Sequence, residues 1–158
     1  MESAEAKFGV SEIESFASKF YQGRPLLLTP YGYNLTFSSL TAGSSATQVI
    51  NIAANADFIL TNIHHRANVA AAAQNVSTKS APLARILITD SGSNEQFTNS
   101  AVDLENYSTN GNIINLQSYP RIISGRSTLT VQLASYEASQ TLNIDVFFEG
   151  VLVRAYAQ

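Results

Sequence analysis

The sequence predicts an all-β protein, an antiparallel β-sandwich preceded by a short N-terminal helix. From residue 31 onward hydrophobic and polar residues alternate along several segments, as in Tyr33, Leu35 and Phe37, which indicates strands with one face in water. Turns rich in Gly, Ser and Asn separate these segments, and no helical pattern lies between them. The length of 158 residues fits one domain of ordinary size with enough apolar residues, 45%, for a core.

Residues 1–30 are expected to form an arm with a helix over residues 11–22. A capping box, Ser11 followed by Glu14, precedes the hydrophobic pattern, and Gly23 and Pro25 end it. Twelve residues are too few for a stable helix in water alone, so the helix must pack on something. The apolar residues on one helical face are Ile13, Phe16, Ala17 and Phe20.

Two interpretations of this arm stay open. The helix packs on its own domain, or it docks on a neighbouring subunit through apolar side chains. The candidate docking residues are Phe8, Val10, Ile13, Phe16 and Phe20. Deleting residues 1–24 separates the two, since the docking interpretation predicts that the remaining domain stays folded but loses oligomerisation or incorporation into a particle.

The sandwich is expected over residues 31–158, and residues 67–80 are expected to form an exposed excursion. The predicted strands are 33–41, 46–53, 57–66, 83–90, 96–104, 112–117, 127–135 and 140–154. The predicted core consists of Leu35, Phe37, Ile50, Ile52, Phe58, Leu60, Ile86, Ile88, Leu129, Val131, Leu133, Ile144, Val146 and Phe148.

Composition argues against several classes of protein. Charged residues make up only 13% of the chain, against about 25% in an average domain. Ser, Thr, Asn and Gln together supply 52 residues, so the surface is expected to be neutral and polar. A net charge of −3 with dispersed basic residues argues against a nucleic-acid partner. No window is apolar enough for a membrane span, and we expect a soluble chain without a secretory signal.

The sequence carries no catalytic constellation. It has no Cys and no Gly-x-Ser-x-Gly elbow, so neither a thiolate nucleophile nor a hydrolase motif is available. His64 and His65 are adjacent in a predicted strand, so their side chains point to opposite faces and cannot share one metal. We therefore expect one half-buried and one solvated imidazole, no catalytic residues, no metal and no cofactor.

Two further groups of residues have alternative interpretations. Asp90, Asn94 and Glu95 offer oxygen ligands for calcium, although Asp, Gly and Asn are also ordinary turn residues. The candidate exposed aromatic surface is formed by Tyr31, Tyr33, Tyr107 and Tyr119, which lie near predicted turns. These tyrosines are expected to form a platform for sugars, or to pack at the sheet edges or in a subunit interface.

Residues 57–154 resemble small structural proteins of tailed-phage virions. The similar segments are residues 57–63, 86–92 and 119–131, together with the closing strand that ends at residues 147–150. The resemblance implies a jelly roll or a related sandwich, with a role in capsid decoration or at the head–tail junction. It implies other virion proteins as partners, such as a major capsid protein, a homo-oligomer, and a place in the virion after synthesis in the host cytoplasm. The alternative is a tail protein or a carbohydrate- or receptor-binding module.

Overall fold

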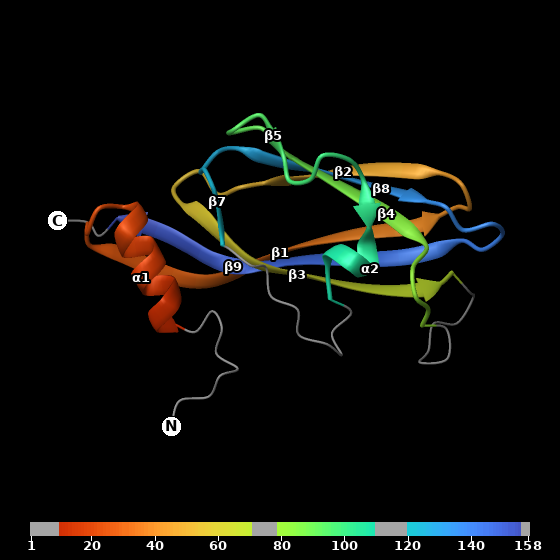
Figure 1. Cartoon of the computed structure of the whole chain (residues 1–158), viewed down its shortest axis with the longest axis horizontal. Helices are drawn as coiled ribbons and strands as arrows, with labels where there is room; N and C mark the ends of the chain where they lie inside the picture. The colour runs from red at the N-terminus through yellow and green to blue at the C-terminus, as the bar shows by residue number, and fades with distance from the viewer. Residues whose placement is uncertain (1–9, 71–78, 110–119, 156–158) are drawn as a thin grey trace, which may run out of the picture.

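The structure is a computed structural model that describes residues 10–70, 79–109 and 120–155, and it consists of two antiparallel sheets packed face to face (Figure 1). One sheet has the order β1-β9-β3-β7, formed by β1 (Leu26–Leu40), β9 (Leu142–Ala155), β3 (Asp57–Val69) and β7 (Arg121–Ile123). The other has the order β2-β8-β4-β5, formed by β2 (Ser45–Asn51), β8 (Thr128–Ser135), β4 (Ala84–Asp90) and β5 (Glu95–Gln96). The short strand β6 (Val102–Asp103) also pairs with β4.

The chain crosses repeatedly between these two sheets. The strands β1, β3, β7 and β9 belong to the first sheet, and β2, β4, β5, β6 and β8 belong to the second. With β5 and β6 sharing one place beside β4, this is the strand order of a jelly roll, an architecture of two interlocked Greek keys. The predicted fold class is therefore confirmed.

The core lies between the two sheets. Each of the fourteen predicted core side chains is buried, and all fourteen belong to one hydrophobic cluster. Alternation placed them correctly because a strand with one wet face directs every second side chain inward. Substituting Val131, which is fully buried, by Asp would place an unpaired charge in this cluster.

The N-terminal helix α1 (Val10–Phe20) lies across the outer face of the first sheet at one end of the sandwich (Figure 1). It ends where Gly23 adopts a φ of +74° and its N–H donates to the carbonyl of Ser18. The sequence prediction of 11–22 was therefore correct in type and extended two residues too far. The strand predicted from residue 33 begins at Leu26, so the proposed boundary at residue 30 falls inside β1.

One predicted strand was wrong. The segment 96–104 is divided into β5, β6 and a single helical turn, α2 (Leu104–Tyr107), because polar residues at 98–100 interrupt the pairing. Leu104, the first residue of this helical turn, is fully buried. The excursion expected from residue 67 begins later, since β3 continues to Val69 and Ala67 is part of the core. The strand predicted at 112–117 lies outside the described residues.

A β-bulge in β3 changes the side of the sheet on which its residues lie. The register against β9 shifts between Leu60 and Asn62. Before the bulge Phe58 and Leu60 face the core, and after it Ile63 does so. Gly150 lies opposite the bulge, and a Cβ there would collide with the carbonyl oxygen of Ile59.

Candidate docking surfaces and polar sites

Helix α1 packs on its own domain. Ala17 is 1% exposed and forms a small hydrophobic cluster with Ile59 of β3 and Val153 of β9. Phe16 packs against the same cluster, Ile13 is half-buried, and Phe20 is 56% exposed. The structure does not describe the side chains of Phe8 and Val10. Of the candidate docking residues, Phe20 thus offers the largest described apolar surface to a partner.

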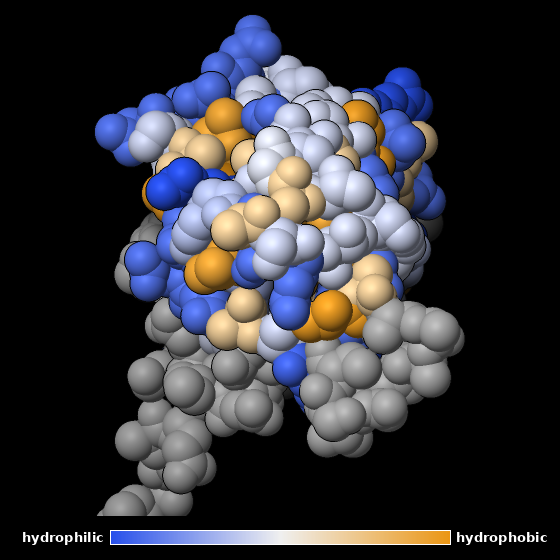
Figure 2. Space-filling model, turned by 90° about the vertical axis from the view of Figure 1, so that its right-hand side faces the viewer, coloured by the Kyte–Doolittle hydropathy of each residue, from blue (hydrophilic) through white to orange (hydrophobic). Residues whose placement is uncertain are grey.

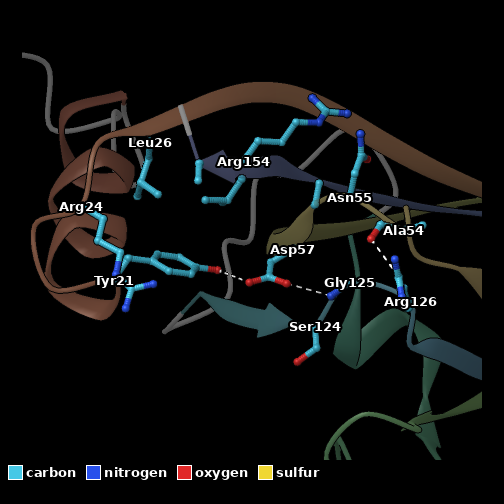
Figure 3. A pocket seen from close by; sticks show the side chains of 13 residues that line it. Tyr21, Arg24, Leu26, Ala54, Asn55, Asp57, Ser124, Gly125, Arg126 and Arg154 are labelled. Atoms are coloured by element: carbon cyan, nitrogen blue, oxygen red, sulfur yellow. Dashed lines mark hydrogen bonds between the residues drawn. The ribbon is translucent and has the colours of Figure 1, made fainter. Parts of the chain in front are cut away.

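Asp57 joins α1 to the sandwich by hydrogen bonds (Figure 3). The Tyr21 hydroxyl donates to Asp57 Oδ2 at 2.6 Å, and the Gly125 N–H donates to Asp57 Oδ1 at 2.8 Å. Burial of the phenol, together with this hydrogen bond, raises the pKa of Tyr21 well above its ordinary value. One carboxylate therefore links the end of α1, the start of β3 and the loop between β7 and β8.

A cleft of about 440 Å³ opens beside this hydrogen-bonded group. Arg24, Arg126 and Arg154 line it, and Asp57 is the one carboxylate among its described lining residues (Figure 3). Arg126 donates from Nε to the carbonyl oxygen of Ala54. None of the three guanidinium groups forms an ion pair within the part of the chain that the structure describes. The cleft therefore presents free N–H donors that suit an anionic group.

The predicted aromatic surface is not brought together. Tyr31 is 48% exposed and lies edge to face against Tyr33, whose ring packs in turn on Phe58 in the core. Tyr107 is in α2, beside β3, so β9 separates it from the tyrosines of β1. Burial raises the pKa of Tyr107. Tyr119 lies outside the described residues, and the described tyrosines form no shared platform.

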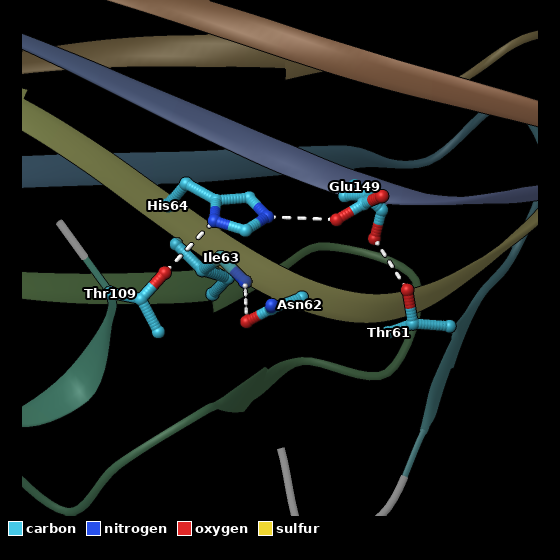
Figure 4. Close-up of polar contacts among 6 residues, drawn as sticks. All are labelled: Thr61, Asn62, Ile63, His64, Thr109 and Glu149. Carbon is cyan, nitrogen blue, oxygen red and sulfur yellow. Dashed lines mark hydrogen bonds and ion pairs between the residues drawn. The ribbon is translucent and has the colours of Figure 1, made fainter. Parts of the chain in front are cut away.

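His64 and His65 lie on opposite faces of β3, as expected from strand geometry. The His64 imidazole lies between two partners, with Nδ1 at 2.8 Å from Thr109 Oγ1 and Nε2 at 2.8 Å from Glu149 Oε2 (Figure 4). A neutral imidazole must donate to the carboxylate from Nε2, so Nδ1 accepts from the threonine hydroxyl. This arrangement fixes the ring on the outer face of the sheet, where it stacks on Phe147.

His65 points inward and is 5% exposed. Its Nδ1 is hydrogen-bonded to the Ser108 hydroxyl, which itself donates to the carbonyl of Leu104. The imidazole must therefore donate from Nδ1, and Nε2 carries a lone pair. Burial, and secondarily the neighbouring His64, lowers the pKa of His65, so the neutral form is favoured.

A pocket of about 240 Å³ adjoins His65. Its lining includes Ser80, Lys79 and Glu105. His65 Nε2 and Ser80 Oγ are both buried, and neither has a hydrogen-bond partner in the part of the chain that the structure describes. They are not bonded to each other, so this pocket holds no serine–histidine dyad, but it can accept and donate hydrogen bonds to a small polar group. No sequence pattern indicated this pocket, because His65 and Glu105, which both line it, are distant along the chain.

The turn after β4 uses its acidic residue internally. Asp90 is 3% exposed, and its two carboxylate oxygens accept from the Gly92 N–H and the Ser93 hydroxyl. These are the contacts of an Asx turn. Among the described residues no three His, Asp or Glu side chains gather as a metal site. The geometry thus favours the turn interpretation over the calcium alternative.

No protein-family model matches the chain, and no curated protein matches it in sequence. The class of the protein is therefore defined by its fold alone, a single jelly-roll domain with a helix packed across one sheet. Among the described helices, neither has the length and apolar character needed to span a membrane.

Proposed function

We propose that this chain is a non-enzymatic structural protein of a tailed-phage virion, a capsid decoration or minor capsid protein that docks on a repetitive protein lattice. Jelly rolls are a common architecture of viral capsid and lectin domains, and the fold is compatible with this role. Both histidines take part in hydrogen bonds within the domain: His64 bonds Thr109 and Glu149, and His65 bonds Ser108.

The observation that carries the proposal is a continuous uncharged side of the sandwich. Residues 25–56 contain no charged residue, and they form both edge strands on that side, β1 and β2. A neutral polar surface packs against neighbours without desolvating unmatched ions, which is a costly step. Figure 2 shows the end of the molecule opposite α1, where pale neutral residues dominate and hydrophobic residues form small separate spots.

Docking on a lattice multiplies a modest affinity per subunit through effective concentration. The test is to purify particles of the phage that encodes the chain and to count its copies by quantitative mass spectrometry. The proposal predicts many copies per particle, in a fixed ratio to the major capsid protein. Particles that contain none of the chain would overturn it, and a few copies per particle would indicate a neck or tail location instead.

The second candidate function is binding of a carbohydrate or a receptor. The pocket beside His65 favours it, because a buried lone pair and an unpartnered serine hydroxyl suit the hydroxyl groups of a sugar. A glycan array with the full chain tests this candidate. Binding that is lost in His65→Phe, and retained when the exposed Tyr31 is replaced by Ala, would support it.

A further inference from the structure

We propose that β1 pairs through its free edge with β1 of a second copy of this chain, so that the two β1-β9-β3-β7 sheets join into one sheet across a twofold axis. This deepens the proposed function by naming a partner and the strand that recognises it. Three features of β1 support this pairing: the direction of its backbone groups, its composition, and the position of Tyr31.

The first feature is the set of backbone groups of β1 that face outward. Along an antiparallel ladder, hydrogen-bonded residues alternate with residues whose N–H and C=O groups point away from the partner strand. The carbonyl of Thr36 accepts a hydrogen bond from the Gln48 side chain of β2, so it does not face β9. Alternation then directs the backbone groups of Leu28, Pro30, Gly32 and Asn34 to the same free side. β1 is an edge strand of its sheet, so no strand among the described residues pairs with this side.

The position of Pro30 agrees with this assignment. Proline has no N–H and is tolerated in a sheet only where that group would face away from a partner strand. Pro30 therefore interrupts one outward donor position and leaves the outward N–H groups of Leu28, Gly32 and Asn34. The segment 28–34 spans about 24 Å at roughly 3.4 Å per residue, which is long enough for a ladder between two strands.

The second feature is that this edge lacks the charged residues that usually protect an edge strand, although Pro30 lies on it. Monomeric sheets guard long edge strands with charges, especially Lys, because a bare edge is a template for pairing with another chain. β1 has fifteen residues and not one charge. In antiparallel self-pairing every residue of β1 faces another residue of β1, so none of the cross-strand pairs contains a charge. An uncharged strand is thus self-complementary.

The third feature is the exposed aromatic side chain at the middle of the free segment. Tyr31 is 48% exposed, and its ring leans on Tyr33 at the end of the core. In a twofold pairing centred on this segment, the two Tyr31 rings would meet across the seam or diagonally, which is a favourable cross-strand arrangement. A sheet edge with a bare backbone and an exposed tyrosine fits a second copy better than it fits a charged partner segment.

The test is the mass of the chain in solution, measured by size-exclusion chromatography with light scattering at increasing protein concentration. The proposal predicts a particle of twice the chain mass of 17.0 kDa. The backbone groups of Asn34, like those of Pro30, face the free side of β1. Asn34→Pro therefore removes an outward N–H and blocks the ladder between the two copies, so it should give a monomer. Asn34→Lys, which places a charge on an exposed side chain of the edge, should also give a monomer.

Thr47→Pro on β2 is the matched control. Ile52 N–H donates to Ser127, and Ser135 N–H donates to Ser44, so even-numbered residues of β2 face β8 and Thr47 faces the other free edge. This variant should stay dimeric. Circular dichroism and thermal melting establish whether each variant is folded. If Asn34→Pro does not fold, Asn34→Lys decides the result.

A wild-type chain that stays monomeric, dimers that survive both Asn34 substitutions, or equal loss with Thr47→Pro would each overturn the proposal. Binding of an extended peptide to a monomeric chain would assign the edge to another partner and would overturn it as well. The result is independent of the particle assay: a dimer absent from particles contradicts the proposed function, and a monomer present on particles contradicts only the pairing.

Discussion

Replacing Tyr21 by Phe tests whether α1 belongs to the domain. The substitution removes one hydroxyl and leaves the ring in place, so the lost interaction is the 2.6 Å hydrogen bond to Asp57. A hydrogen bond to a charged acceptor contributes about 1.5–3 kcal/mol, and we expect the free energy of unfolding to fall by about 2 kcal/mol. For a domain of this size about 2–4 °C of Tm corresponds to each kcal/mol, so Tm should fall by about 4–8 °C.

The pH dependence of stability gives a second measurement on the same side chain. The pKa of Tyr21 is raised in the folded state above its ordinary value of 10.0. Below pH 10 the phenol is neutral in both states and its stabilising contribution is complete. As the pH rises above 10, the unfolded chain ionises first, so stability is lost with increasing pH. The loss above pH 10 should be smaller in Tyr21→Phe than in the wild type.

Chemical unfolding and thermal melting of the two proteins measure these effects, with Tyr31→Phe as the control. Tyr31 is exposed, and among the described residues its ring contacts Tyr33 while its hydroxyl has no hydrogen bond, so Tyr31→Phe should stay within about 0.5 kcal/mol of the wild type. Deleting residues 1–24 should destabilise the domain more than Tyr21→Phe, because it also uncovers Ile59 and Val153. Unchanged melting of both Tyr21→Phe and the truncated chain would refute the reasoning and restore the docking interpretation of the arm.

Four further outcomes are expected. Gly150→Ala should lower the free energy of unfolding by about 1–3 kcal/mol or more, because the added Cβ collides with the Ile59 carbonyl oxygen. Gly43→Ala is the control: there is open space around Gly43, so this variant should lose less stability, and only through the positive φ of that residue. Equal melting temperatures of the two variants would argue against the bulge geometry. Val131→Asp should abolish cooperative folding, judged by solubility and circular dichroism, and a well-folded variant would show that the register is wrong. The pKa of His65 is lowered in the folded state, so the unfolded chain binds the proton first as the pH drops below 6.5. Stability should therefore fall with falling pH, by at most about 1.4 kcal/mol per pH unit for this group. A His65→Gln variant that loses stability at low pH as steeply as the wild type would contradict this. Chelation with EDTA should leave Tm unchanged, and a drop of several degrees would point to calcium at Asp90.

The sequence was informative wherever packing follows a short period. Alternation along β8 and the first half of β9 identified buried residues, because one face of each segment is in water, whereas residues 150–153 of β9 are all buried. It was less informative at the start of β1, where three consecutive leucines and Pro30 resemble a break. The proline is tolerated there only because its missing donor faces the free edge, which depends on the tertiary position of the strand.

The polar sites could not be predicted from local patterns. Asp57 meets Tyr21 and Gly125, which come from opposite ends of the sequence. The lone pair on His65 Nε2 follows from the contacts of Ser108, whose hydroxyl donates to the Leu104 carbonyl and so accepts from His65 Nδ1. Such contacts depend on which strands become neighbours, and a single sequence carries no periodic signal for that choice.

The strand order also constrains the sequence of events during synthesis. β9 lies between β1 and β3, and β8 lies between β2 and β4, so the last two strands to leave the ribosome occupy the interior of both sheets. Until they emerge, β1 and β2 have no strand partner, and β3 and β4 are paired only with the short strands β7, β5 and β6. Such long-range pairing makes folding slow and leaves partly synthesised chains prone to aggregation. The decisive step of folding therefore waits for β8 and β9, and a chain that stops before β8 cannot complete either sheet.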